Sequence, residues 1–331
     1  MYSIKMFGVR EEEITIAQNW AAENNIKLSM TKEILTMDNL AEVSGFDGIS
    51  LSQVGRLPDE IYPKLAQMGI KQLAQRSAGV DMYNLELAKE NGIIITNVPS
   101  YSPESIAEFT VTTALELIRR TEEIRQRVAS HDFSWEPVIR GRVLGNMTVA
   151  VIGTGRIGQI TAKLFKGFGA KVVGYDLYPN KELTDILEYQ DTLVDAVKQA
   201  DVISLHMPAV KENYHAFDYA MFKNCKKDAI LLNMARGSLV DTKALLQALD
   251  EGLLQGAGID TYEYEAPYMP KDFSSKEITD ELFLALINHP QVIYTPHIAY
   301  YTDEAVKNLV EGGLDATLEV LNTGDAKTRV N

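Results

Sequence analysis

The sequence predicts an α/β protein with two doubly wound, mainly parallel sheets, and three observations support this class. Short apolar runs alternate with helix-like stretches along most of the chain, which favours parallel strands joined by helices. A length of 331 residues favours two domains. A glycine-rich turn at residues 153–158 follows an apolar run, so a second series of strands and helices begins in mid-chain.

The first hundred residues contain the first series of elements. Strands are expected at Ile4–Val9, Lys27–Met30, Gly48–Leu51, Lys71–Ala74 and Ile93–Thr96. Helices are expected at Glu11–Asn24, Met37–Val43, Asp59–Met68 and Asn84–Glu90. Because strands and helices alternate, we expect a parallel sheet with helices on both faces.

A long helix is expected next. Ser102-Pro103-Glu104 supplies an N-cap, a proline at the first helical position and an acid in the first turn. The residues that then recur at roughly helical spacing are Ile106, Phe109, Thr113, Leu117 and Ile124. They predict one helix from about Pro103 to Val128, long enough to bridge two domains.

The second series begins at Thr148. Its expected strands are Thr148–Ile152, Lys171–Tyr175, Val202–His206, Ala229–Asn233, Gly256–Asp260 and Val292–Thr295. Residues Glu265–Ile278 carry two prolines and several charges, which is typical of an exposed loop. A final helix is expected at Asp303–Leu321.

Composition limits the partners and the location of the protein. The formal net charge of −14 disfavours nucleic acid and anionic membrane as partners. Cys225 is the only cysteine, so no intramolecular disulfide can form, as is common in reducing compartments. The N-terminus lacks the apolar core of a signal peptide, and no apolar run approaches the ~18 residues that span a bilayer. We therefore expect a cytoplasmic protein.

The glycine-rich turn predicts a dinucleotide site. Gly153, Gly155 and Gly158 have the G-x-G-x-x-G spacing, behind an apolar strand and ahead of an amphipathic stretch. The first glycine permits the turn, the second admits a pyrophosphate and the third allows helix and strand to pack closely. Asp176 ends the next strand, where a carboxylate accepts hydrogen bonds from ribose hydroxyls and repels a 2′-phosphate. The cofactor is therefore predicted to be NAD.

The five histidines differ in their positions relative to the expected strands. Because ligands bind where parallel strands end, these positions indicate which histidines can lie in a ligand site. His131 and His215 lie in polar segments and are expected at the surface, and His289 precedes a strand. His206 follows a strand, where it either lines the cofactor site or fixes the loop structurally. His297 also follows a strand, behind a proline, and is the best candidate for a general acid or base.

Two further charged residues follow neighbouring strands of the same series. Arg236 comes after the strand at 229–233 and Glu265 after the strand at 256–260. An arginine binds a carboxylate through two parallel bonds, and a carboxylate orients an imidazole. With His297 these groups suit the reduction of a 2-keto acid. One cysteine and scattered histidines predict no metal site.

Five sequence motifs resemble those of the D-isomer-specific 2-hydroxyacid dehydrogenase family, above all its D-lactate and D-2-hydroxyisocaproate branches. They lie at residues 97–108, 166–172, 233–237, 258–265 and 295–302. The resemblance covers nearly the whole chain. It implies a Rossmann NAD-binding domain at 102–298, inserted into a discontinuous, flavodoxin-like substrate domain formed by 1–101 and 299–331. It also implies a homodimer with the helix at Pro103 in its interface.

The resemblance implies roles for individual residues. Arg236 binds the substrate carboxylate and polarises the keto oxygen, while His297 donates the proton and Glu265 stabilises its imidazolium form. Further substrate contacts are implied for Ala78, Gly79, Tyr101 and Tyr300. Beyond the three glycines, the implied cofactor contacts are Arg156, Ile157, Asp176, Met207, Pro208, Asn213, Met234, Ala235, Arg236 and Asp260.

Alternatives remain open at this point. Ser52 stands where lactate-specialised relatives carry a bulky aromatic residue, and Tyr300 resembles the hydroxyisocaproate enzymes, so the substrate is pyruvate or a larger 2-keto acid. An NADH-sensing binding protein on the same fold is the alternative from another class. A formate dehydrogenase is disfavoured because that branch places a neutral amide, not a glutamate, beside its histidine.

Overall fold

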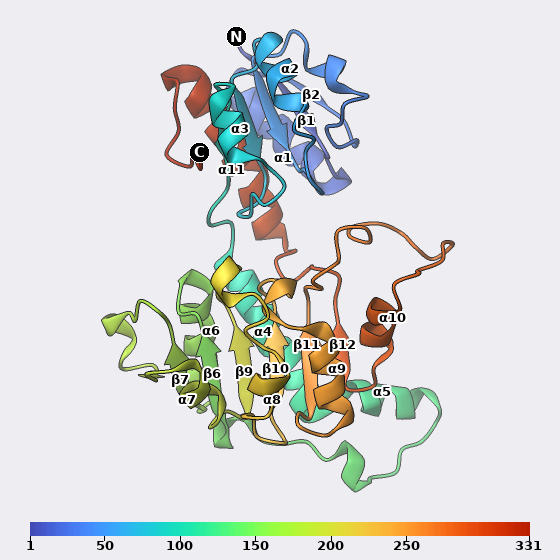
Figure 1. Ribbon diagram of the computed structural model, residues 1–331. Helices are drawn as coiled ribbons and strands as arrows, with labels where there is room; N and C mark the ends of the chain where they lie inside the picture. Colours follow the sequence, from blue (N-terminus) through green and yellow to red (C-terminus); the bar gives the residue numbers. More distant parts are fainter. The chain divides into compact units, whose positions relative to one another are not determined.

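The computed structural model describes residues Met1–Asn331 and divides into two compact units. Unit 1 comprises Met1–Ser102 and Tyr301–Asn331, and unit 2 comprises Pro103–Tyr300 (Figure 1). Unit 1 is therefore discontinuous in sequence. Each unit contains one parallel sheet, of five and seven strands respectively, which confirms the predicted α/β class with two parallel sheets.

The sheet of unit 1 has the strand order β2-β1-β3-β4-β5. Its strands are β1 (Ser3–Phe7), β2 (Lys27–Met30), β3 (Gly48–Leu51), β4 (Gln72–Gln75) and β5 (Ile94–Thr96). Its helices are α1 (Glu11–Glu23), α2 (Ile61–Gln67), α3 (Leu85–Glu90) and α11 (Asp303–Thr323). Two cores flank the sheet: one contains side chains of α2 and α3, the other side chains of α1 and α11. Buried apolar residues on both faces explain why β3 and β4 are fully buried.

The sheet of unit 2 has the order β12-β11-β10-β9-β6-β7-β8, and Figure 1 shows its strands side by side. They are β6 (Thr148–Ile152), β7 (Lys171–Tyr175), β8 (Glu188–Tyr189), β9 (Val202–Leu205), β10 (Ile230–Asn233), β11 (Gly256–Ile259) and β12 (Val292–Tyr294). All pairs are parallel, so their carboxyl ends share one edge. The chain order reverses at β6, between β7 and β9, which is where ligands bind in such sheets.

The helices of unit 2 are α4 (Pro103–Arg119), α5 (Thr121–Ala129), α6 (Arg156–Gly167), α7 (Leu193–Val197), α8 (Tyr219–Phe222), α9 (Thr242–Asp250) and α10 (Glu281–Asn288). Side chains of α7, α8, α9 and α10 share one core with the sheet. Helix α4 packs on α6, β10 and β11. Short 3-10 turns occur at Leu40–Val43, Pro137–Ile139, Leu144–Asn146, Lys181–Leu183, Lys211–Asn213 and Gly237–Leu239. No helix has the length and apolar character needed to cross a bilayer.

The prediction of one helix from Pro103 to Val128 is wrong. Arg120 has left-handed backbone angles, φ 53 and ψ 41, which end α4 and start α5. The N–H of Arg142 donates to the carbonyl of Ile118, so another segment satisfies the end of α4. Helix α5 has no buried residue. The apolar spacing that extends into α5 is therefore not the buried face of one continuous helix.

Candidate active site

The turn after β6 has the geometry that binds a pyrophosphate. Gly153 has φ +92, which side chains rarely tolerate, and a Cβ on Gly158 would stand 2.0 Å from the Gly153 carbonyl oxygen. A Cβ on Gly155 would meet nothing within 4 Å, so the space beside it is open. Arg156 and Ile157 begin α6, and its positive N-terminal end faces this turn. The tight turn at Gly153 and the close packing at Gly158 are thus present as predicted, while the admission of a pyrophosphate at Gly155 stays a prediction.

Asp176 follows β7 and is bound to the glycine turn. Its Oδ2 accepts hydrogen bonds from the Thr154 N–H at 2.6 Å and the Thr154 hydroxyl at 3.1 Å. Its Oδ1 accepts from the N–H of Tyr178 at 2.8 Å. The Thr154 hydroxyl lies 2.8 Å from that of Tyr189, a residue of β8. These contacts fix the carboxylate at the carboxyl end of the sheet, where a ribose is expected.

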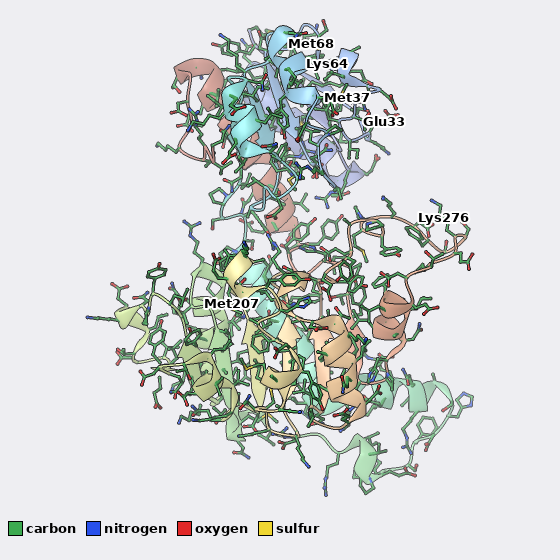
Figure 2. All side chains as sticks on the ribbon, viewed as in Figure 1. Glu33, Met37, Lys64, Met68, Met207 and Lys276 are labelled. Atoms are coloured by element: carbon green, nitrogen blue, oxygen red, sulfur yellow. The ribbon has the colours of Figure 1, made fainter.

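Other predicted cofactor contacts lie in the turns after β9 and β10. Met207, labelled in Figure 2, and Pro208 follow β9 directly. The Asn213 amide donates to the Pro208 carbonyl at 2.8 Å, which closes this turn. Met234 and Ala235 follow β10, and Met234 is buried. All five residues therefore lie along the same edge as the glycine turn.

His206 fits the structural alternative. Its Nε2 lies 2.8 Å from the Ser204 hydroxyl, and its N–H donates to the carbonyl of Ile152 at 2.7 Å. Burial lowers the pKa of His206 to about 3, so the ring is neutral at physiological pH. A neutral ring held in this way supports the loop and does not supply a proton near neutrality.

Arg236 lies just after the carboxyl end of β10, and its guanidinium forms no salt bridge within the chain. The Asn233 amide donates to the Arg236 carbonyl at 2.9 Å, which fixes the turn. The guanidinium donates to the Ala235 carbonyl at 2.8 Å but forms no ion pair with any carboxylate. In a protein with 46 acidic residues, an arginine at a ligand-binding edge without a carboxylate partner is suited to an anionic ligand.

The turn after β12 places His297 and is held by Asp260. His297 has φ 54, a left-handed conformation that is unfavourable for a residue other than glycine. Its N–H donates to the Asp260 carbonyl at 2.7 Å. The buried Asp260 carboxylate accepts from the N–H groups of Ile298 at 2.9 Å and Ala299 at 3.0 Å. Asp260 thus fixes the turn that carries His297, a role that the sequence did not indicate.

The structure brings His297 and Glu265 together. His297 Nδ1 lies 2.6 Å from Glu265 Oε1, although the residues are 32 positions apart. The other carboxylate oxygen accepts from the Tyr262 N–H at 3.0 Å, so Glu265 is itself held. With Nδ1 bound to the carboxylate, Nε2 is left as the nitrogen that can exchange a proton. Glu265 can therefore orient the imidazole of His297.

His215 is only partly exposed where a surface position was expected. Its side chain is 24% exposed, and its Nε2 lies 2.7 Å from Oε2 of the buried Glu263. The ring of Tyr214 stacks on the His215 ring. The polar residues around His215 in sequence give no sign of this partner 48 positions away. His131, in contrast, is exposed as expected.

Unit 1 contains Ser52, Ala78, Gly79 and Tyr101, whereas Tyr300 is the last residue of unit 2. The Asn97 amide donates to the Ala78 carbonyl at 2.7 Å, and the Ser77 hydroxyl donates to the Gly79 carbonyl at 2.7 Å. The Tyr101 carbonyl accepts from the Asn308 amide at 2.6 Å. The loop at 77–79 is therefore fixed through its carbonyl groups.

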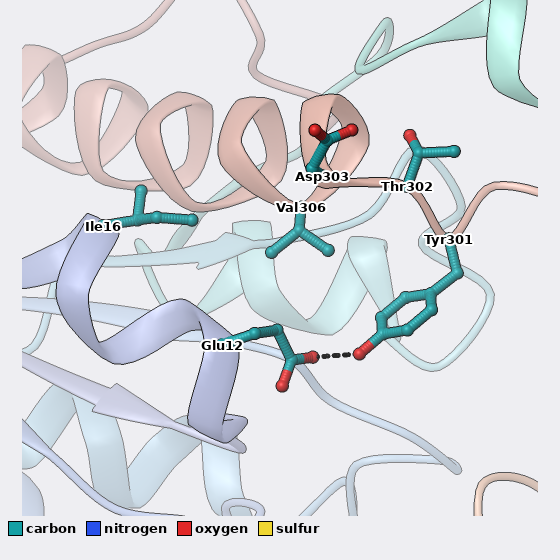
Figure 3. Close-up of a pocket in the computed structure, with 6 residues that line it drawn as sticks. All are labelled: Glu12, Ile16, Tyr301, Thr302, Asp303 and Val306. Atoms are coloured by element: carbon teal, nitrogen blue, oxygen red, sulfur yellow. Dashed lines mark hydrogen bonds between the residues drawn. The ribbon is translucent and has the colours of Figure 1, made fainter.

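A pocket of about 300 Å³ lies elsewhere in unit 1, between α1 and the start of α11 (Figure 3). It is lined by Glu12, Ile16, Tyr301, Thr302, Asp303 and Val306. The Tyr301 hydroxyl donates to Glu12, and Arg10 lies over the Tyr301 ring. None of the predicted site residues lines this pocket.

Comparison with known proteins identifies the family. Residues 111–299 match the family described as "D-isomer specific 2-hydroxyacid dehydrogenase, NAD binding domain". The chain belongs to the D-isomer-specific 2-hydroxyacid dehydrogenase family. A D-lactate dehydrogenase of Streptococcus agalactiae serotype III is 65% identical over 328 residues, which are 99% of each chain. The predicted family is thus confirmed, and the matched residues correspond to its NAD-binding domain.

Solved structures of this family have the same fold. A D-lactate dehydrogenase from Treponema pallidum matches with a TM-score of 0.92 and 40% identity, over 99% of each chain. A D-2-hydroxyisocaproate dehydrogenase matches with the same TM-score and 39% identity, again over 99% of each chain. Because both branches match equally well in backbone, the fold does not distinguish their substrates.

Proposed function

We propose that this chain is an NAD-dependent D-lactate dehydrogenase that reduces pyruvate to D-lactate. Family membership and a relative named D-lactate dehydrogenase at 65% identity support the activity. The observation that carries the chemistry is the His297–Glu265 pair, 2.6 Å apart, at the strand edge that also holds the glycine turn. A ketone reduction requires a proton donor for its oxygen, and an oriented imidazole can serve as one.

The glycine turn and Asp176 fit NAD. The open space beside Gly155 and the start of α6 suit a pyrophosphate, and the fixed Asp176 carboxylate suits an unphosphorylated ribose. Bound NADH supplies the hydride that reduces C2 of the keto acid. The turns that carry Met207, Pro208, Asn213, Met234 and Ala235 enclose the rest of the cofactor in this proposal.

Arg236 and His297 have different roles toward the substrate. The unpaired Arg236 guanidinium binds the substrate carboxylate through two parallel hydrogen bonds, and it polarises the keto oxygen. His297 then donates its Nε2 proton to that oxygen, and Glu265 stabilises the imidazolium that precedes the transfer. Ala78 and Gly79 assist through their N–H groups, and Tyr101 and Tyr300 contact the substrate.

The substrate side chain has a second candidate. The family resemblance implies that lactate-specialised relatives tend to carry a bulky aromatic residue where this chain has Ser52, and a small residue there favours 2-keto acids larger than pyruvate. We retain pyruvate because full-length relatives at 65% and 52% identity are named D-lactate dehydrogenases. The test is kcat/KM for pyruvate, 2-ketoisocaproate and phenylpyruvate with NADH, followed by chiral analysis of the product. NADH binding without oxidation by any of the three would instead indicate a binding protein.

A second copy of the chain is the partner that we propose. Unit 2 exposes apolar side chains between α5 and β6, among them Trp135 at 96% and Phe133 at 70%. Such exposure is typical of a surface that is covered by another protein. We therefore propose a homodimer in which this segment and α4 form the interface. A cytoplasmic location also stays a prediction.

A further inference from the structure

A cluster of titratable side chains lies beside the proposed active site without belonging to it. His215 Nε2 lies 2.7 Å from Glu263 Oε2, and His215 Nδ1 lies 3.8 Å from Asp241 Oδ2. The Glu263 side chain is only 3% exposed. A carboxylate this deeply buried requires strong partners, and an imidazole at this distance is one of them.

The second oxygen of Glu263 binds the start of helix α9. Its Oε1 accepts a hydrogen bond from the N–H of Thr242 at 3.1 Å. Asp241 precedes Thr242 and caps the same helix by accepting from the Ala244 N–H at 3.0 Å. Glu263 therefore joins His215 on one side to the start of α9 on the other, and the chain enters α9 from the segment that carries Arg236 and Gly237.

Backbone bonds join the same segments. We call residues 206–217 the cofactor loop, residues 234–241 the arginine loop and residues 260–265 the glutamate loop. The N–H of His215 donates to the Ser238 carbonyl at 2.9 Å, and the N–H of Asp241 donates to the Phe217 carbonyl at 3.1 Å. The end of the cofactor loop thus runs alongside the arginine loop.

The arginine and glutamate loops also touch through their main chains. A Cβ on Gly237 would stand 2.3 Å from the Glu263 nitrogen and 2.3 Å from the Tyr262 carbonyl carbon. Glu263 is therefore packed against the residue next to Arg236, and it lies two positions before Glu265. A displacement of Glu263 would therefore move both Arg236, through its neighbour Gly237, and Glu265.

We propose that His215, through Glu263, is a positioning residue that sets the place of Arg236 relative to the substrate carboxylate. This inference rests on the proposed function, in which Arg236 binds that carboxylate. His215 does not touch the reacting atoms in this account. It supplies the buried Glu263 with a hydrogen bond, and Glu263 in turn fixes the arginine loop and the glutamate loop.

The test compares His215→Ala, His215→Gln and wild type in pyruvate reduction. His215→Ala is expected to raise KM for pyruvate about tenfold, because small displacements of a substrate clamp are costly. The Kd for NADH is expected to change less than about twofold, since the glycine turn and Asp176 stay in place. His215→Gln, whose amide can donate to Glu263, is expected to restore most of the loss.

His289→Ala is the matched control. His289 is also a partly exposed histidine beside a carboxylate, with its Nε2 3.4 Å from Asp250 Oδ1, but it precedes β12 and contacts none of the three loops. The KM of His289→Ala for pyruvate is expected to equal that of wild type. Should His215→Ala fail to fold, Glu263→Gln tests the same pair and is expected to raise KM in the same direction.

The outcomes separate the two proposals. An unchanged KM in His215→Ala, or no recovery in His215→Gln, overturns the positioning role of His215. Arg236→Lys provides the other reference, since an ammonium cannot reproduce the guanidinium fork. If Arg236→Lys leaves KM for pyruvate unchanged, the proposed function of Arg236 fails, whatever the His215 variants show.

Discussion

Asp260 is the residue that makes the conformation of His297 possible. A left-handed, non-glycine residue costs of order 1 kcal/mol or more and persists only where its surroundings determine it. Here the carboxylate of Asp260 accepts from the N–H groups of two successive residues after His297, and its own carbonyl accepts from the His297 N–H. The position of the proposed proton donor therefore depends on this buried carboxylate.

Asp260→Asn tests that dependence. The amide nitrogen cannot accept a hydrogen bond, so the N–H of Ile298 or of Ala299 loses its partner. We expect the free energy of unfolding to fall by about 1–3 kcal/mol and kcat to fall as His297 leaves its position. Urea denaturation and steady-state kinetics measure both quantities. A variant with wild-type kcat would show that Asp260 does not position His297.

Cys225 is expected to be unreactive in the folded protein. Burial raises the pKa of the Cys225 thiol to about 12, and the charged thiolate is the reactive form. At pH 8 only roughly one thiol in ten thousand is then ionised, and the fraction rises about tenfold for each pH unit. Mass spectrometry after iodoacetamide treatment should find little alkylation of the native chain and full alkylation in urea. Equal alkylation in both states would contradict the burial.

Some residues of the site could be predicted from sequence, and others could not. Arg236, Glu265 and His297 were predicted because each follows a strand of one parallel sheet, and such positions meet at one edge. The pairing of His215 with Glu263 has no sequence signal, because it depends on loop paths that hydrophobic patterns do not encode. For the same reason Asp260 was expected beside the cofactor, and its bonds to the turn of His297 were not anticipated.

At the scale of single elements, the strand–turn–helix unit of β6 and α6 offers a sharp test. Gly155 has open space at its Cβ position, whereas a Cβ on Gly158 would collide with the Gly153 carbonyl. Gly155→Ala should therefore keep the melting temperature of the free protein and weaken NADH binding. Gly158→Ala should lower both the melting temperature and the affinity, because helix and strand must move apart.

Thermal denaturation without cofactor and NADH titration by fluorescence distinguish the two variants. The pair contains its own control, since each substitution adds one methyl group to the same turn. Equal melting temperatures for Gly155→Ala and Gly158→Ala would contradict the packing described for Gly158.

Elements differ in how well the sequence predicted them. Apolar runs ended by a turn residue placed most strands within a residue; β2, β3, β6 and β7 have the predicted limits. The two-residue strand β8 is too short and too polar to give such a pattern. The predicted helix at Met37–Val43 is only a 3-10 turn at Leu40–Val43. The break at Arg120 was missed because arginine carries no sequence signal for a left-handed conformation.

At the scale of the whole molecule, the proposed dimer gives a prediction about association. Substituting Phe133 and Trp135 together by Asp places two charges in the proposed apolar interface, which is unfavourable unless they are paired. Sedimentation equilibrium should give the wild type a mass of twice the 36.8 kDa of one chain, and the double variant the mass of a single chain. Tyr178→Asp is the control, because Tyr178 is an aromatic residue 87% exposed that belongs neither to α4 nor to the segment between α5 and β6. A monomeric wild type would contradict the dimer.

The proposed mechanism depends on the transfer of a proton from His297 to the substrate oxygen. The most direct test is kcat for pyruvate reduction by His297→Ala, with His289→Ala as the matched histidine control. We predict that His297→Ala lowers kcat by ~10²–10⁴ and leaves the Kd for NADH nearly unchanged, while His289→Ala retains full turnover. Full turnover by His297→Ala would contradict the mechanism.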